Sequence, residues 1–284
     1  MNLSITYPEF VQVCPSAEVP DELLFDRLKS EIESKTNFVE EILGKTLAHD
    51  IESAKADLVL PSEDSVTELA KTAKRYVCTA AFRDALPHLD LVLTPNGFGV
   101  VSNQNVAPAS ADRVERLREA LRRASLAHFD HMLDYARHFE SFLGTWGCRS
   151  YFHSLFWRGD HCRHLGIPNP TRDDLEEKRP ALNAKEDVMR EILSPEFYAE
   201  LIKAESTATA NYEQEETIGY IRRAIGVAVV EPKKYPAMLR ILLSWLESQK
   251  EAFPTYVNSQ AYKARHSEPY ENEQDDPCYF FGGI

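Results

Sequence analysis

The sequence predicts a mainly α protein: a helical bundle with an inserted β-hairpin, a second helical half and an extended aromatic C-terminal arm. Apolar residues recur at steps of three and four through several long segments, which predicts the helices. Only 11 of 284 residues are glycine, which favours an ordered globular chain. A third observation predicts the hairpin, because two runs rich in β-branched residues flank Thr94-Pro95-Asn96-Gly97. The apolar fraction of 43% is enough for a sizeable core and argues against a disordered or fibrous chain.

The first domain is expected at residues 1–145 and begins irregularly. Its elements in order are helices at 21–44 and 64–86, a hairpin at 91–102 and a helix at 111–143. Gly44 is read as a helix stop, and Pro87 is expected to close the second helix. The helix at 111–143 would be about 50 Å long at 1.5 Å per residue. We expect its apolar seam to pack on the second helix, with a coiled-coil contact between subunits as the alternative.

The second half is also expected to be mainly helical. A second helical domain spans 146–253 and starts where the composition shifts to aromatic residues, Cys, His and Gly. Its apolar periodicity predicts helices at 185–204, 211–229 and 235–252. Residues 254–284 are rich in Tyr, Phe and acids without any regular period, which predicts an extended C-terminal arm.

Composition limits the classes of function. The 45 acidic and 32 basic residues give a formal net charge of −13, and the excess of acids lies in the two ends of the chain. This balance argues against broad binding to the DNA backbone, which needs clustered Lys and Arg. The five cysteines are an odd, widely spaced set without a CxxC motif, and no signal-like apolar run follows Met1, so we expect an unsecreted protein with reduced thiols. No apolar stretch is long enough to predict a transmembrane helix.

One segment contains residue types that bind metals. Within 17 residues it holds Cys148, His153, His161, Cys162 and His164. These side chains suit Zn²⁺, but their spacing matches no common zinc motif. We therefore favour a packed aromatic turn with incidental Cys and His, and predict no metal or other cofactor. A metal-dependent enzyme with a Cys/His site is the alternative.

Other catalytic signals are missing from the sequence. No nucleophile elbow, zinc-protease, P-loop or dinucleotide-binding motif occurs, so we predict no catalytic residues. The long helix carries a basic face made of Arg113, Arg116, Arg118, Arg122 and Arg123. Interleaved acids are expected to neutralise much of that face through ion pairs within the helix. A solvated or subunit-facing surface is favoured there over a nucleic-acid contact.

Two irregular, aromatic elements are the best candidates for partner binding. The candidate residues are Tyr270, Tyr279, Phe280 and Phe281 in the C-terminal arm, followed by Asn96, Gly97 and Phe98 in the hairpin. An aromatic segment without periodicity cannot bury its rings by folding on itself, so we expect it to dock on another surface. Whether that surface is its own bundle or a neighbouring chain stays open.

Three stretches together resemble an uncharacterised family of phage and prophage proteins associated with virion connector genes. They are VCTAAFRDALPHLDLVLTPNGFGVVSNQNVAPAS with RVERLREAL after it, FPTYVNSQAYKARHSEPYENEQDDP and the terminal CYFFGGI. The order of elements in residues 1–145 is also similar to that of phage head-tail connector proteins, also called head completion or adaptor proteins. Those are small helical subunits that form a ring beneath the portal. The simple connectors are about half as long, and residues 146–284 have no counterpart in them.

The resemblance implies a structural virion protein that forms a ring between portal and tail. Its partners would be the portal protein, neighbouring copies of itself, and a tail or stopper protein, without a membrane. DNA would pass the channel without specific binding, which suits the negative net charge. The chain would be assembled in the bacterial cytoplasm and located in the virion. A host helical scaffold or regulator that binds one protein partner is the second reading.

Overall fold

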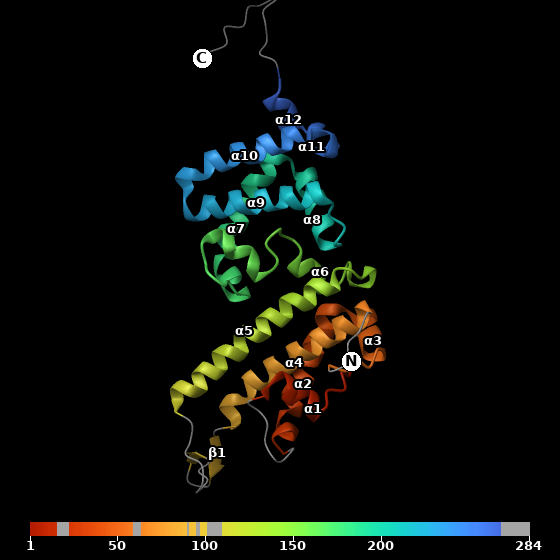
Figure 1. The fold of residues 1–284 in the computed structure, drawn as a ribbon, viewed down its shortest axis with the longest axis vertical. Coiled ribbons are helices and arrows are strands. Elements are labelled where there is room, and N and C mark those ends of the chain that lie inside the picture. The colour runs from red at the N-terminus through yellow and green to blue at the C-terminus, as the bar shows by residue number, and fades with distance from the viewer. Residues whose placement is uncertain (16–22, 59–63, 90, 95–96, 101–109, 268–284) are drawn as a thin grey trace, which may run out of the picture.

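The structure is a computed structural model that describes residues 1–15, 23–58, 64–89, 91–94, 97–100 and 110–267. The described part is dominated by helices, and the mainly α class is confirmed. The molecule is elongated, with the strands at one end and α12 at the other (Figure 1). No helix among the described residues combines the length and the apolar character that crossing a membrane requires.

The first half is a bundle built on two long helices that lie side by side (Figure 1). Its elements are α1 (Tyr7–Val13), α2 (Leu23–Leu43), α3 (Lys45–Ser53), α4 (Ser65–Leu89), β1 (Leu91–Thr94), β2 (Gly97–Val100), α5 (Ala111–Ala136), η2 (Glu140–Phe142) and α6 (Trp146–Tyr151). The main contact is α5 on α4, and α2 packs on α4 as well. The expected packing of the long helix on its predecessor is therefore confirmed.

Strands β1 and β2 pair antiparallel between α4 and α5. Their register runs from Leu91 opposite Val100 to Thr94 opposite Gly97. This pairing falls within the segment 91–102 for which the sequence predicts a hairpin. Residues 95–96, the centre of the predicted turn, lie outside the described residues.

The second half is a separate helical body with its own core. Its elements are η3 (Gly159–Leu165), α7 (Arg172–Leu193), α8 (Pro195–Ser206), α9 (Tyr212–Val230), η4 (Pro232–Lys234), α10 (Tyr235–Ser248), η5 (Lys250–Ala252), α11 (Pro254–Val257) and α12 (Gln260–Arg265). The core gathers apolar residues of α7, α8, α9 and α10 around Phe197 and Tyr198. One core of the first half includes Cys148 and Phe152 and reaches as far as Trp157. The change of core therefore falls at about Leu155, later than the predicted boundary after residue 145.

Several predicted helix ends are wrong for identifiable reasons. The helix expected at 111–143 ends at Ala136, and tight turns follow in which Phe139 N donates to Ala136 O at 3.0 Å. Those turns bring Phe142 fully into the core. Pro87 does not close α4, which continues to Leu89. Proline in the last turn costs only one backbone hydrogen bond, so the helix tolerates it there.

Two further helices replace the one expected at 185–204. α7 begins at Arg172, because Thr171 and Asp174 form a capping box, and it ends at Leu193. Ser194 has a φ of +108°, and its side chain accepts a hydrogen bond from Phe197 N at the start of α8. A left-handed φ at a serine is strained, but the cap and the change of direction hold it in place.

The extended arm expected from residue 254 is wrong for its first part. Residues 254–265 form α11 and α12 and pack on the second core, where Tyr256 is buried and Tyr262 half-buried. The rings of Tyr256 and Tyr262 lie 5.2 Å apart, edge to face. α11 and α12 are too short for an apolar period to be recognised in the sequence. The remainder of the predicted arm, residues 268–284, lies outside the described residues.

Candidate functional site

The predicted partner-binding residues are placed only in part. Gly97 lies opposite Thr94 and Phe98 opposite Leu93 in the paired strands. The other candidates lie outside the described part of the chain; they are Asn96, Tyr270, Tyr279, Phe280 and Phe281.

The Cys/His segment does not form a metal centre within the described residues. Nowhere in them do three His, Cys, Asp or Glu side chains come together as ligands. Cys148 belongs to a core of the first half and Cys162 to the core of the second, so these two thiols are separated. Burial raises the pKa of the Cys162 thiol to about 12. His161 packs edge-on against the Trp157 ring at 5.3 Å, which agrees with the packed aromatic turn expected from the sequence.

The basic face of α5 is partly neutralised by acids on the same helix, as expected. Arg123 Nε contacts Glu119 at 2.9 Å, and Arg122 also reaches that carboxylate. Arg122 makes a further ion pair with Asp173 of α7 at 2.7 Å. This contact is the exposed edge of a polar junction between the two halves.

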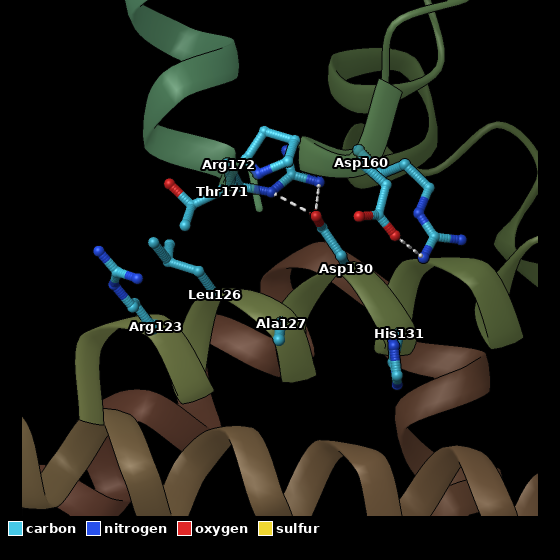
Figure 2. A pocket seen from close by; sticks show the side chains of 10 residues that line it. Arg123, Leu126, Ala127, Asp130, His131, Asp160, Thr171 and Arg172 are labelled. Carbon is cyan, nitrogen blue, oxygen red and sulfur yellow. Dashed lines mark hydrogen bonds and ion pairs between the residues drawn. The ribbon is translucent and has the colours of Figure 1, made fainter. Parts of the chain in front are cut away.

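The centre of the junction is an ion pair between Asp130 of α5 and Arg172 at the start of α7. Figure 2 shows the guanidinium of Arg172 facing the carboxylate of Asp130. Arg172 Nε donates to Asp130 Oδ1 at 2.7 Å, and Gly159 N donates to Oδ2 at 2.8 Å. Arg172 also donates to Trp157 O at 2.8 Å. The side chains of Arg172 and Asp130 are only 7% and 10% exposed, so one residue of each half depends on the other for its hydrogen bonds.

Aromatic rings shield this ion pair. The Arg172 guanidinium lies 4.8 Å from the centre of the Phe129 ring and 5.0 Å from that of Tyr151. Both rings belong to the first half, and they touch each other edge to face at 5.3 Å. Cation–π contacts of a desolvated arginine add to the attraction of the carboxylate. Arg172 is therefore held by the first half on two sides.

A second polar cluster extends the junction around Trp157. The indole Nε1 donates to Glu205 of α8 at 2.7 Å, and Arg222 of α9 donates to the same carboxylate oxygen at 2.8 Å. Arg137, which follows α5, donates to Glu205 O at 2.7 Å and lies over the Trp157 ring at 5.3 Å. These four side chains tie the end of α5 to α8 and α9. A hollow of about 340 Å³ beside them is lined by both arginines and Glu205.

Burial and charge shift the pKa values in opposite directions at these two clusters. Burial raises the pKa of Asp130 above its usual value, although Arg172 and the N–H of Gly159 act against it. Burial also acts to raise the pKa of Glu205, but Arg222 and the Trp157 indole outweigh it, so the net pKa lies below the usual value. Burial near Arg222 and Arg158 holds the pKa of His161 well below its usual range. Glu205 and His161 therefore keep their neutral-pH forms into acid conditions.

A second, smaller hollow of the junction lies beside Asp130, and it is too small and too well paired to hold a substrate. It measures about 80 Å³ and is lined by residues of α5, η3 and the start of α7, including Asp160 (Figure 2). Asp130 is bonded to Arg172, and Asp160 contacts Arg158 at 3.1 Å. With their charges compensated, these groups are arranged to fix two bodies together. Room for a few waters is all that the volume provides.

Sequence reasoning did not predict the pairs that form the centre of the junction. Asp130 and Arg172 are 42 positions apart, and Trp157 and Glu205 are 48 apart, so no local motif connects them. The only available signals were an acid on the apolar seam of the long helix and a tryptophan among arginines. Neither signal predicts which residue forms the other half of the pair.

A comparison with models of protein families gives a match to part of the first half. Residues 39–142 match the model of a family of unknown function, DUF6712. The match covers a little more than a third of the chain, from the end of α2 through η2. Neither the curated proteins nor the solved structures gave a match.

Proposed function

We propose that this chain is a structural virion protein of a phage or prophage, a head-tail connector or adaptor that forms a homo-oligomeric ring between portal and tail. The observation that carries the proposal is the junction described above. The pairs Asp130–Arg172 and Trp157–Glu205 join two helical bodies into one elongated unit (Figure 1). A ring subunit between two neighbours must hold a fixed distance and angle between the surfaces it presents to each.

The elements at the two ends fit such a role. In the proposed ring, the segment 91–102 acts as a projecting hairpin, and the C-terminal segment acts as an arm toward the portal or a neighbouring copy. The strands and α12 lie at opposite ends of the molecule, so the two elements would reach different neighbours (Figure 1). The net charge of −13 suits a channel wall that passes DNA without retaining it, because like charges repel.

The state of the buried thiols favours a structural role over nucleophilic catalysis. Burial raises the pKa of Cys14 and of Cys162 to about 12, and that of Cys78 well above its usual value. A thiol is nucleophilic as the thiolate, which these environments disfavour at neutral pH. Stoichiometric zinc in the purified protein, lost on Cys162→Ala, would instead favour the metal-dependent enzyme.

The decisive experiment is assembly on a portal. The full-length chain is mixed with the portal protein encoded in the same genome, and the product is imaged by negative-stain electron microscopy. We expect a ring of this chain on one face of the portal. Absence of association across a range of salt, pH and protein ratio would refute the proposal. A gene neighbourhood without portal and capsid genes would favour the host scaffold or regulator.

A further inference from the structure

One exposed apolar surface of the second body lies on α10. The helix buries Leu242 and Leu246 against α9, but its apolar residues extend beyond that seam. Met238, Ile241 and Trp245 follow at steps of three and four and so share one side of the helix. Met238 and Trp245 are half-buried and Ile241 is 48% exposed. We name these three residues the α10 stripe.

Contacts with α9 hold Trp245 of the α10 stripe in a fixed position. Trp245 Nε1 donates to Thr217 Oγ1 of α9 at 2.9 Å, and the ring of Tyr220 lies 5.4 Å from that of Trp245. Thr217 is itself fully buried. A fixed aromatic platform with an adjacent exposed isoleucine loses little conformational entropy when a partner covers it.

The chain contains a segment whose composition matches this surface. Residues 268–284 carry four aromatic side chains, five acids and no Lys or Arg. The chain is basic around the start of α10, where Lys233 and Lys234 of η4 and Arg240 of α10 are all exposed. Glu231 is the acid that pairs with Lys234 there. The aromatic residues of the segment therefore match the apolar α10 stripe, and its acidic residues match the basic residues near the start of α10.

The starting point and length of the segment permit this contact. It follows α12, which is fastened to the C-terminal end of α10: Tyr262 Oη donates to Glu247 at 3.1 Å, and His266 Nε2 lies 3.3 Å from the same carboxylate. Seventeen residues span up to about 60 Å when extended. α10 itself is about 21 Å long. The segment is therefore long enough to cross a subunit boundary and still cover a full α10.

We propose that residues 268–284 of one copy bind the α10 stripe of a neighbouring copy, with the acids of the segment directed to Lys233, Lys234 and Arg240. The inference rests on the ring of the proposed function and names the contact that closes it. A closed ring needs two different, complementary surfaces on each subunit, and the segment and the stripe form such a pair. Binding in this mode resembles that of a linear peptide on a preformed surface.

The first test measures binding of the segment alone. A fluorescently labelled peptide of residues 268–284 is titrated with the full-length variant Tyr279→Ser/Phe280→Ser/Phe281→Ser, whose own segment cannot compete, and anisotropy is recorded. We expect saturable binding that Ile241→Glu in the same background weakens by about tenfold or more. Lys233→Glu/Lys234→Glu should weaken it as well, and added salt should reduce binding. Val188→Glu is the control, since Val188 is similarly exposed on α7, and it should leave affinity unchanged.

The second test decides which copy provides the segment. The full-length Ile241→Glu chain keeps a working segment, and the Tyr279→Ser/Phe280→Ser/Phe281→Ser chain keeps a working stripe. Each alone should remain monomeric by light scattering at high concentration, whereas the mixture should form the complex of the two. A mixture that stays monomeric, with peptide binding only to the segment variant and not to wild type, would overturn the proposal in favour of docking on the same copy. Failure of the peptide to bind would overturn it outright.

These outcomes are separate from those of the portal experiment. If Ile241→Glu still forms normal rings on a portal, the segment contact is wrong while the connector function stands. If wild type forms no ring but the mixture of variants associates, the contact stands as a self-association and the connector function fails.

Discussion

Removing Arg172 should separate the two halves of the molecule. Arg172→Met leaves an unbranched apolar side chain at this position but removes the guanidinium that lies over the rings of Phe129 and Tyr151. Asp130 then stays buried and, among the residues that the structure describes, keeps the Gly159 N–H as its hydrogen-bond donor. Because a buried carboxylate without its counter-ion is costly, we expect the free energy of unfolding to fall by about 4 kcal/mol. Exposure of 10% leaves that carboxylate little access to water.

The loss can be assigned to the ion pair by a double-mutant cycle. Asp130→Asn keeps an oxygen for Gly159 but leaves Arg172 without its carboxylate, which we expect to cost about 3 kcal/mol. Asp130→Asn/Arg172→Met contains neither charge. Its cost should therefore fall short of the sum by about 2 kcal/mol. Arg163→Met is the control: the Arg163 side chain is 68% exposed, and its pair with Asp160 should contribute less than about 1 kcal/mol.

The assay is guanidinium unfolding at pH 7, followed by far-ultraviolet circular dichroism and by tryptophan fluorescence. Circular dichroism reports all helices, whereas fluorescence in a Trp146→Phe/Trp245→Phe background reports Trp157 at the junction. In wild type the two transitions should coincide because each half depends on the other through shared buried bonds. In Arg172→Met they should separate and the fluorescence change should come first. Coincident transitions with an unchanged midpoint would refute the idea that this pair joins the halves.

Two further predictions concern the same region. In α9, Gly226→Ala places a methyl carbon 2.6 Å from His164 O, whereas Gly219→Ala meets nothing within 4 Å. Gly219→Ala should therefore stabilise the protein by up to about 1 kcal/mol, because alanine has the higher helix propensity. Gly226→Ala should destabilise it by about 1–3 kcal/mol, because the added methyl group does not fit. Both effects are measured as shifts of the thermal midpoint, and stabilisation by both variants would contradict the close packing of α9 on η3. His161 has a pKa well below its usual range, so below about pH 6.5 its side chain binds a proton in the unfolded chain but not in the folded chain. The free energy of unfolding should therefore decrease by up to about 1.4 kcal/mol for each pH unit below about 6.5. His161→Gln should flatten that slope in unfolding experiments between pH 6.5 and 5, with His153→Gln at an exposed histidine as the control, and an unchanged slope in His161→Gln would rule out this source of acid sensitivity.

Helices with a strong apolar period are the part of the fold that the sequence predicts well. α2, α4 and α9 begin and end within three residues of the expected positions, because their buried residues recur at three and four and because Gly44 stops the first of them at a φ of +79°. The first half of α7 was missed for the opposite reason. Its residues 172–181 are mostly charged or polar and include Pro180, and the helix is started by a capping box and held by the buried Arg172. Local periodicity carries no record of such a tertiary contact.

The bonds of the junction have directions that fix how the two helical bodies sit relative to each other. Two helical bodies joined by a few apolar contacts could rotate against each other, since an apolar contact has little directional preference. The bonds of Arg172 do have directions: its Nε reaches Asp130 Oδ1, and it also donates to the carbonyl of Trp157. Trp157 in turn donates its indole N–H to Glu205. A rotation that disturbs the Arg172 bonds would therefore also strain the bond between Trp157 and Glu205. A fixed orientation of this kind suits the connector subunit proposed above, which must hold a set geometry between its neighbours. The bonds made by residues 130, 157, 172 and 205 hold the two helical bodies in one relative orientation.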